Sequence, residues 1–299
     1  MKVLIVYLHG IGDSILFTPA LRLYREKHPD HELYILCLKL TEGLWKTNPI
    51  IKKVFTSSYF NKPPHHGWYH LYIPERIRIQ KEINKIRTEN NIDKVIYIVP
   101  RSIKLFKFLL PLPGKIRRLP FFHKFEEHEI IKLCRLLNVD KNKLWPKAFK
   151  QEIYITNNYR KKASDILKKI KKPICIMHTS GSSKNKDLTN EETNKIIDYL
   201  KEKGFNIILF NGNLKNSKIH LVNSNSILLS AALIEKSDLF IGIDSGPAHI
   251  AEALNKSSIV IAKAFRTELL YIKKNNNMLL NNYDYSKIIE AIDRFSKNL

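Results

Sequence analysis

The sequence contains little cysteine and no long hydrophobic run. Three of its 299 residues are cysteine, Cys37, Cys134 and Cys175, and each lies inside an apolar segment. They show neither the spacing of a metal site nor the even number of a disulfide framework. The longest apolar stretches, such as residues 95–99, are strand-sized and far shorter than the roughly 20 residues that span a membrane. We therefore expect buried thiols, a reducing cytoplasm and no membrane-spanning helix.

Acidic residues are also scarce. Lys and Arg number 51 against 28 Asp and Glu, which gives a formal charge of +23 and indicates an anionic partner. Nucleic acid, an anionic membrane surface and a phosphorylated substrate all meet this condition. A lysine bias in an AT-rich genome would raise the charge without any functional reason. The charge alone therefore does not identify the partner.

Short β-rich apolar runs alternate with segments of helical period through most of the chain. This pattern predicts the α/β class, with parallel sheets covered by helices on both faces. Because 299 residues exceed what one hydrophobic core usually organises, we expect two domains. The predicted strands are 2–8, 33–38, 52–55, 93–99, 173–178, 205–210, 227–229, 239–243 and 257–262. The predicted helices are 14–27, 75–89, 126–137, 157–171, 189–203, 247–254 and 285–297.

The domain boundary is predicted near residues 138–150, which are polar, rich in lysine and contain Trp145-Pro146. The two predicted domains are 1–152 and 153–283. Residues 284–299 form an amphipathic terminal helix that could pack back on the first domain. In such domains ligands bind at the carboxyl ends of strands, where loops run into helix N-termini. Three such loops carry polar residues.

The first loop, residues 9–14 (HGIGDS), follows the first predicted strand and opens a helix. Its two glycines allow a tight turn and close approach to a ligand, and free N–H groups at the helix start favour an anion. Asp13 has two interpretations: the N-cap of the helix, or a general base that accepts the proton of an attacking hydroxyl. Pro19 lacks an N–H for the helical ladder, so we expect a kink or a shortened first segment.

The second loop, residues 178–186 (HTSGSSKNK), follows the first strand of the second half. Its hydroxyls and glycine suit a pyrophosphate, and a lysine can neutralise the charge that grows on a leaving group. The spacing of a Walker A loop is absent. A solvated Ser/Lys turn is the alternative interpretation.

The third loop ends a buried strand in Asp244-Ser245-Gly246, with Pro247 at the start of a helix and His249 in its first turn. The exposed N–H groups can hold a phosphate or a ribose. As an alternative, Asp244 or Ser245 can be a simple N-cap, which needs no ligand. A histidine such as His249 is, taken alone, more often structural.

The first and third loops belong to two longer motifs. One is Ile11-Gly12-Asp13, followed by Thr18-Pro19-Ala20-Leu21 and Pro29; the other is residues 244–249 (DSGPAH), followed by Ala251 and Ala253-Leu254. Together they bracket nearly the whole chain. In order and spacing they resemble the signatures of glycosyltransferase family 9, the bacterial heptosyltransferases.

The resemblance implies a GT-B architecture, in which two Rossmann-like domains have parallel sheets that face a central cleft. The first domain would hold the acceptor and the second the nucleotide sugar. The implied reaction is inverting and independent of metal, and ADP-heptose is a substrate, so no cofactor is expected. The implied acceptor is a lipopolysaccharide or lipooligosaccharide core, either Kdo-lipid A or an inner-core heptose.

The resemblance also assigns roles to residues. Asp13 would be the general base, and Lys186 would contact the diphosphate. Leu188 and Thr189 stand where the family has Trp and Pro, so Lys184 remains an alternative to Lys186. Residues 262–267 (AKAFRT) differ from the family's Phe-Gly-Pro-Thr-like loop near the donor. The expected donor-binding residues are Thr179, Ser180, Lys184, Lys186, Asp244, Ser245, Gly246 and His249.

A basic segment supplies acceptor candidates. Residues 101–125 contain seven basic residues and no acidic residue, interleaved with five phenylalanines. Such a segment can lie against an anionic membrane surface or grip an acidic glycolipid, although a solvated loop is the alternative. We therefore expect peripheral association with the cytoplasmic face of the inner membrane. The acceptor candidates are Gly12, Lys62, Arg101, Arg117 and Arg118, with His65 and His66 as weaker ones.

Other functions remain open from sequence. A related transferase could use a UDP- or GDP-sugar, or transfer heptose to a protein, because these enzymes share the scaffold. A nonenzymatic sugar-nucleotide binder is a further alternative. A nucleic-acid-binding protein would fit the charge, but no zinc finger, RNP-like strand or basic region with heptads is present, so no nucleic acid is expected.

Overall fold

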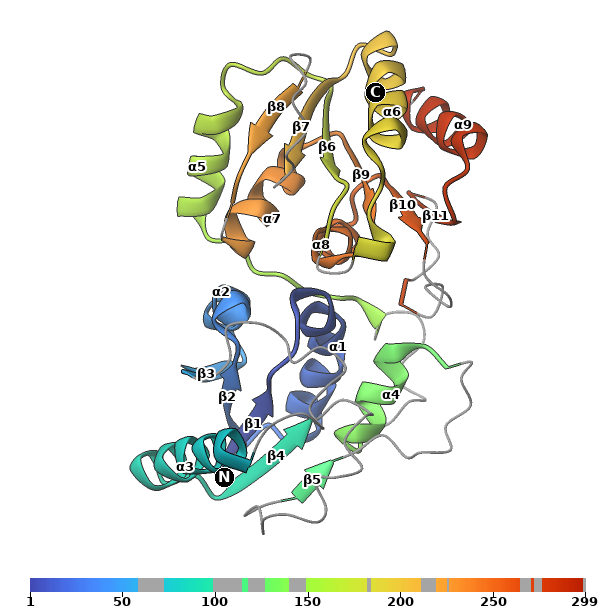
Figure 1. Ribbon diagram of the computed structural model, residues 1–299. Helices are drawn as coiled ribbons and strands as arrows, with labels where there is room; N and C mark the ends of the chain where they lie inside the picture. The colour runs from blue at the N-terminus through green and yellow to red at the C-terminus, as the bar shows by residue number, and fades with distance from the viewer. Residues whose placement is uncertain are drawn as a thin grey trace. The chain divides into compact units, whose positions relative to one another are not determined.

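The computed structural model describes residues 1–58, 73–98, 115–117, 127–139, 149–181, 184–210, 219–224, 226–263, 270–271 and 276–297, with side chains except at 73–76 and 115–117. The chain divides into two compact units, Met1–Lys150 and Gln151–Leu299 (Figure 1). We call them the N-terminal and the C-terminal unit. The boundary expected after residue 152 lies close to this division.

The N-terminal unit is built on a parallel sheet whose described strands lie in the order β3-β2-β1-β4-β5. This is the doubly wound order, in which the chain starts at the centre and builds first one half and then the other. Its strands are β1 (Lys2–Tyr7), β2 (Glu32–Cys37), β3 (Ile51–Thr56), β4 (Lys94–Ile98) and β5 (Lys115–Arg117). Its helices are α1 (Ile11–Lys27), a 3-10 turn η1 (Lys39–Thr41), α2 (Glu42–Lys46), α3 (Ile73–Asn90) and α4 (Glu129–Leu136).

Alternation along β1 divides the core of this unit between the two faces of the sheet. Leu4, Val6 and Leu8 face a cluster that includes α3 residues such as Ile83. Tyr7 points to the opposite face and stacks on Phe17 of α1, with ring centroids 4.4 Å apart. Tyr7 and Phe17 therefore form a buried aromatic pair between β1 and α1.

Helix α1 runs from Ile11 to Lys27 without interruption at Pro19. Pro19 cannot donate to the carbonyl oxygen of Ile15, and the Thr18 hydroxyl donates to that oxygen instead at 2.8 Å. The expected shortening of the helix is therefore wrong, because a neighbouring side chain replaces the missing backbone bond.

The C-terminal unit repeats the doubly wound plan with one more strand. The order is β11-β10-β9-β6-β7-β8, again parallel throughout the described pairs. Its strands are β6 (Ile174–His178), β7 (Asn206–Phe210), β8 (Ile219–Val222), β9 (Leu239–Ile243), β10 (Ser258–Ala262) and β11 (Asn277–Asn281). Its helices are α5 (Asn157–Leu167), a 3-10 turn η6 (Lys184–Lys186), α6 (Asn190–Glu202), α7 (Ile227–Lys236), α8 (Gly246–Ala253) and α9 (Tyr285–Ser296).

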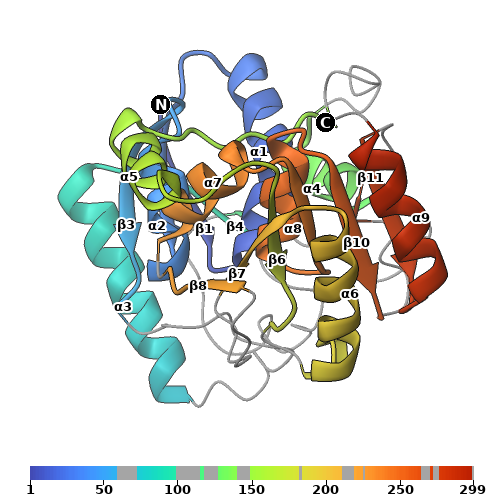
Figure 2. The same ribbon diagram turned by 90° about the horizontal axis from the view of Figure 1, so that it is seen from above.

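The terminal helix α9 belongs to the core of the C-terminal unit. Ile288 and Ile292 lie in one buried cluster with Ile196 of α6 and Met177 of β6. Figure 2 shows α6 and α9 side by side, and the Tyr199 hydroxyl of α6 donates to the Asp293 carboxylate of α9 at 2.8 Å. The apolar face of α9 is therefore buried in the core of its own unit.

One predicted strand is a helix. Residues 227–229 were expected to be a strand, but they open α7, whose N-cap Ser226 accepts a hydrogen bond from the Leu229 N–H. Three apolar residues in a row fit either structure, and the cap and the helical period after them decide for the helix. The actual neighbour of β7 is β8, a half-exposed strand that the apolar pattern did not indicate.

In the part of the chain that the structure describes, no helix is long and apolar enough to cross a membrane. The expectation of buried thiols is confirmed, because Cys37, Cys134 and Cys175 are buried and free. Burial raises the pKa of Cys37 and Cys134 to about 12, so these side chains are inert packing groups.

Candidate active site

The polar residues of the second and third loops meet at the centre of the C-terminal sheet. Neighbouring strands β6 and β9 connect in opposite directions, to β7 on one side and to β10 on the other. Ligands of doubly wound sheets bind outside the carboxyl ends of the strands at such a switch point. The loops that leave β6 and β9 touch there, since His178 Nδ1 lies 3.0 Å from Ser245 Oγ.

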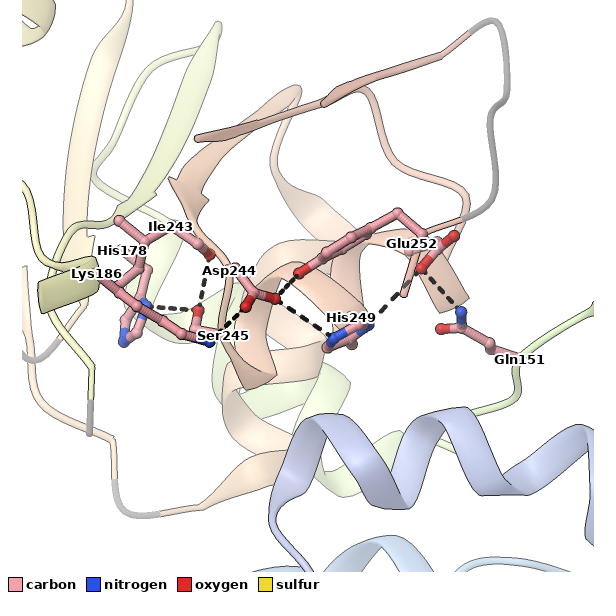
Figure 3. Close-up of polar contacts among 9 residues, drawn as sticks. Gln151, His178, Lys186, Ile243, Asp244, Ser245, His249 and Glu252 are labelled. Atoms are coloured by element: carbon pink, nitrogen blue, oxygen red, sulfur yellow. Dashed lines mark hydrogen bonds and ion pairs between the residues drawn. The ribbon is translucent and has the colours of Figure 1, made fainter. Parts of the chain in front are cut away.

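Asp244 is the centre of this cluster (Figure 3). Its carboxylate Oδ2 lies 2.5 Å from Lys186 Nζ, and its Oδ1 accepts a hydrogen bond from the Tyr271 hydroxyl at 2.9 Å. The His249 Nε2 faces Oδ1 at 3.9 Å. The Asp244 side chain is 5% exposed and that of Lys186 is 32% exposed. A buried carboxylate requires such partners, and the lysine is the member of the pair that can also reach an incoming anion.

His178 and Ser245 form a neutral pair beside this carboxylate. The Ser245 hydroxyl donates to the Ile243 carbonyl at 3.1 Å, so His178 Nδ1 acts as the donor toward Ser245 Oγ. Burial lowers the pKa of His178 to about 4, against a weaker opposing effect of Asp187. The ring is therefore uncharged at neutral pH and holds the Ser245 side chain in place.

The N-cap residue of α8 makes no capping hydrogen bond with its side chain. Ser245 occupies the N-cap position, but its hydroxyl is engaged with His178 and Ile243, and it makes no capping hydrogen bond. Proline follows Gly246 in the first turn, and Gly246 is half-buried. Ser245 is thus the N-cap residue, as one of the alternative interpretations expected, whereas Asp244 is not, and the Ser245 side chain makes no capping bond. N–H groups at such a helix start can bind an anion.

A second buried carboxylate lies beyond His249. The His249 Nδ1 faces Glu252 Oε2 at 3.8 Å, and Glu252 accepts a hydrogen bond from Gln151 Nε2 at 2.8 Å (Figure 3). The His249 ring stacks on Tyr271 with centroids 4.5 Å apart and planes within 6°. His249 therefore lies between two carboxylates with its plane fixed by an aromatic neighbour.

The loop after β6 holds Lys186 against Asp244 and leaves Lys184 in solvent. Both lysines belong to η6, but Lys184 is exposed. The loop is closed by Asp187, whose carboxylate accepts from the Gly181 N–H at 2.8 Å. At the start of this loop Thr179 is buried and Ser180 half-buried. The structure thus gives the two rival lysines different surroundings.

In the N-terminal unit Asp13 lies in the first turn of α1. Gly10 is the N-cap, so the interpretation of Asp13 as the cap is wrong. The Asp13 backbone carbonyl accepts from the buried Tyr7 hydroxyl at 2.8 Å, and its residue is exposed. Within the described residues no hydrogen bond or ion pair engages its carboxylate. Gly12 stands beside it and is half-buried. Among the described residues, Asp13 is thus an exposed carboxylate without a partner, at a backbone position that Tyr7 holds.

Sequence comparison identifies the family. The model of glycosyltransferase family 9 (heptosyltransferase) matches residues 123–295, which is more than half of the chain. The chain belongs to glycosyltransferase family 9. It is 25% identical to lipopolysaccharide heptosyltransferase 1 of Campylobacter coli, in an alignment that covers 94% of this chain and 89% of that protein. Family membership makes the chain a glycosyltransferase.

Solved structures of family 9 proteins share the fold. The family 9 glycosyltransferase of Veillonella parvula matches with a TM-score of 0.77 at 16% identity, over 100% of this chain and 98% of that one. The ADP-heptose lps heptosyltransferase II of E. coli matches with a TM-score of 0.74 at 12% identity, over 100% and 99%. The two doubly wound units therefore form the GT-B fold that the resemblance implied.

Against this family background, the structure brings together the expected donor residues that flank the switch point: Lys186, Asp244, Ser245 and His249. Sequence reasoning missed Tyr271, because it lies outside the three polar loops and no motif marks it. It also missed Glu252, whose place three residues after His249 on α8 was the available signal. No group of three or more His, Cys, Asp or Glu in the described residues could hold a metal ion.

Most of the acceptor candidates lie outside the residues that the structure describes. Lys62, Arg101 and Arg118, with His65 and His66, lie outside the described residues. Arg117 ends β5, but its side chain is not described. Gly12 is therefore the acceptor candidate whose surroundings are known.

Proposed function

We propose that this family 9 enzyme transfers heptose from ADP-heptose to a lipopolysaccharide or lipooligosaccharide core acceptor, Kdo-lipid A or an inner-core heptose. The observation that carries the proposal is the contact of Lys186 with Asp244 beside the uncapped N-terminus of α8, at the switch point of the C-terminal sheet. The similar E. coli protein is named for ADP-heptose, and the C. coli relative is named a lipopolysaccharide heptosyltransferase.

The donor diphosphate binds across the loops after β6 and β9. Lys186, already one-third exposed, provides the positive charge, and the N–H groups of the α8 start provide directed donors. Both stabilise the negative charge that develops on ADP as the bond to the anomeric carbon breaks. In this proposal they take the place of a divalent cation, and the enzyme uses no cofactor.

The acceptor hydroxyl is activated by Asp13. Its carboxylate accepts the hydroxyl proton while the oxygen attacks the anomeric carbon, and ADP departs from the opposite face with inversion. Asp13 suits this role because its carboxylate is exposed and has no other partner in the described residues, while Tyr7 holds its backbone. Gly12, Lys62, Arg101, Arg117 and Arg118 remain the proposed acceptor contacts, and the enzyme works at the cytoplasmic face of the inner membrane.

The nucleotide specificity tests the proposal. A ligand that binds only the folded protein raises its melting temperature, so ADP, UDP, GDP and CDP can be compared in one thermal-shift series. We expect ADP to give the largest shift. A preference for UDP or GDP would keep the transferase and exclude ADP-heptose. No shift with any of the four nucleotides would contradict nucleotide-sugar binding itself.

A further inference from the structure

Tyr271 lies against the donor cluster although it belongs to none of the expected motifs. Its hydroxyl donates to Asp244 Oδ1 at 2.9 Å, and its ring stacks on His249 with centroids 4.5 Å apart. The residue is 7% exposed. One side chain from a segment between β10 and β11 therefore contacts both the carboxylate and the imidazole that flank the start of α8.

The direction of this hydrogen bond is fixed by chemistry. Burial, and then the charge of Asp244, raise the pKa of Tyr271 well above its ordinary value. The hydroxyl keeps its proton at any physiological pH and donates it to the carboxylate. The two oxygens of Asp244 consequently have separate partners: Oδ1 bonds to Tyr271 and Oδ2 to Lys186.

We propose that Tyr271 is a positioning residue of the donor site, which holds the Asp244 carboxylate so that Oδ2 and Lys186 face a nucleotide diphosphate sugar. This inference rests on the proposed function. Without the hydroxyl, Oδ1 loses this hydrogen bond, and His249 Nε2 at 3.9 Å is beyond hydrogen-bond distance. The carboxylate keeps the contact of Oδ2 with Lys186 but loses the bond that fixes its rotation.

The test uses Tyr271→Phe, which removes the hydroxyl and keeps the ring that stacks on His249. The matched control is Tyr199→Phe, because Tyr199 donates to the Asp293 carboxylate at 2.8 Å in the same unit, on helices α6 and α9. Each change therefore removes one tyrosine-to-aspartate hydrogen bond. The ligand-free melting temperature of each variant reports whether it folds.

We expect Tyr271→Phe to raise the Kd and KM for ADP-heptose about tenfold, as the loss of a hydrogen bond to a charged group does. The KM for the acceptor and the affinities of Tyr199→Phe should stay at wild-type values. If Tyr271 acts through Asp244, Tyr271→Phe should cost nothing further in an Asp244→Asn background. ADP-heptose affinity of Tyr271→Phe within about twofold of wild type, or full additivity with Asp244→Asn, would overturn the inference.

A ligand-free crystal structure of Tyr271→Phe tests the positioning role of Tyr271 even if the proposed function is wrong. Should the wild-type protein bind no ADP-heptose, the proposed function fails, and the position of the Asp244 carboxylate still decides whether Tyr271 holds it. A carboxylate rotated from its wild-type position is the expected result. A carboxylate unchanged from the wild-type protein would contradict the positioning role.

Discussion

Lys184 and Lys186 stand at the two ends of one 3-10 turn in different surroundings, so each is the control for the other. Lys186 lies 2.5 Å from Asp244, whereas Lys184 is exposed. We expect Lys186→Ala to weaken ADP binding at least about tenfold, because a charge-assisted contact to the diphosphate is lost. Lys184→Ala should change the affinity for ADP less than about twofold, because solvent screens the charge of an exposed lysine. Isothermal titration of ADP gives both values, and the reverse order would reassign the diphosphate contact.

His178 predicts a dependence of stability on pH. Its pKa is lowered by burial to about 4, from an ordinary value of 6.5. Between these values the unfolded chain takes up a proton that the folded protein does not, so the free energy of unfolding falls as the pH falls from 6.5 to 4. The loss is about 3 kcal/mol by linkage. Above pH 6.5 both states are neutral at this site and the effect vanishes.

The variant His178→Asn isolates this effect, because an amide can still donate to Ser245 Oγ but does not titrate. Urea unfolding at pH 7, 5.5 and 4 gives the free energies. We expect the wild-type protein to lose about 3 kcal/mol more than the variant over this range. Equal losses in the two proteins would mean that His178 has the same pKa in the folded and the unfolded protein.

At the scale of elements, Gly242 of β9 has no room for a side chain, because the Phe240 ring of the same strand and the backbone of the neighbouring strand β6 occupy the space. A Cβ at Gly242 would lie 2.8 Å from Phe240 Cζ and 2.9 Å from the His178 carbonyl oxygen. We expect Gly242→Ala to lower the free energy of unfolding by about 2 kcal/mol, because the buried ring and the strand must both shift.

Gly181→Ala is the matched control, since among the described residues its added methyl group meets the end of the Ile243 side chain at 3.3 Å and no backbone atom. Its cost should stay below about 1 kcal/mol. Chemical denaturation of both variants measures the difference. A Gly242→Ala protein as stable as Gly181→Ala would show that the two strands can move apart without cost.

The elements that the sequence predicts well are those with a continuous apolar run or a marked cap. Strand β6 was expected at 173–178, and α6 was expected to begin near Thr189, which forms a capping box with Glu192. Strands β8 and β11 were missed because their exposed or half-exposed residues break the apolar pattern. Residues 227–229 were misread because a short apolar run carries no period of its own.

At the scale of the whole molecule, two doubly wound sheets follow from the alternating pattern, and the family motifs lie at their strand ends. The sequence located the polar loops, but it could not show that Tyr271 joins them, because that contact links positions 27 residues apart through the fold. Nor could it decide between Lys184 and Lys186, which differ only in three-dimensional surroundings. The sequence therefore predicted which loops carry polar residues, whereas the contacts between those residues could be described only from the structure.

In the proposed mechanism the C-terminal unit binds the donor and Asp13 of the N-terminal unit is the base, so transfer requires both units. Asp13→Asn keeps the size of the side chain and removes its ability to accept a proton. We expect it to lower the transfer rate at least about a hundredfold, the usual contribution of a general base. The melting-temperature shift with ADP should remain that of the wild-type protein, because the donor residues are untouched.

The most direct measurement is mass spectrometry of Kdo-lipid A incubated with ADP-heptose and either the wild-type protein or Asp13→Asn. We expect the wild-type protein to add one heptose with release of ADP, and Asp13→Asn to leave the acceptor almost unmodified while still binding ADP. Equal conversion by the two proteins would exclude Asp13 as the base. Absence of any heptose product from a wild-type protein that binds ADP, with inner-core heptose acceptors as well, would contradict the proposed transfer itself.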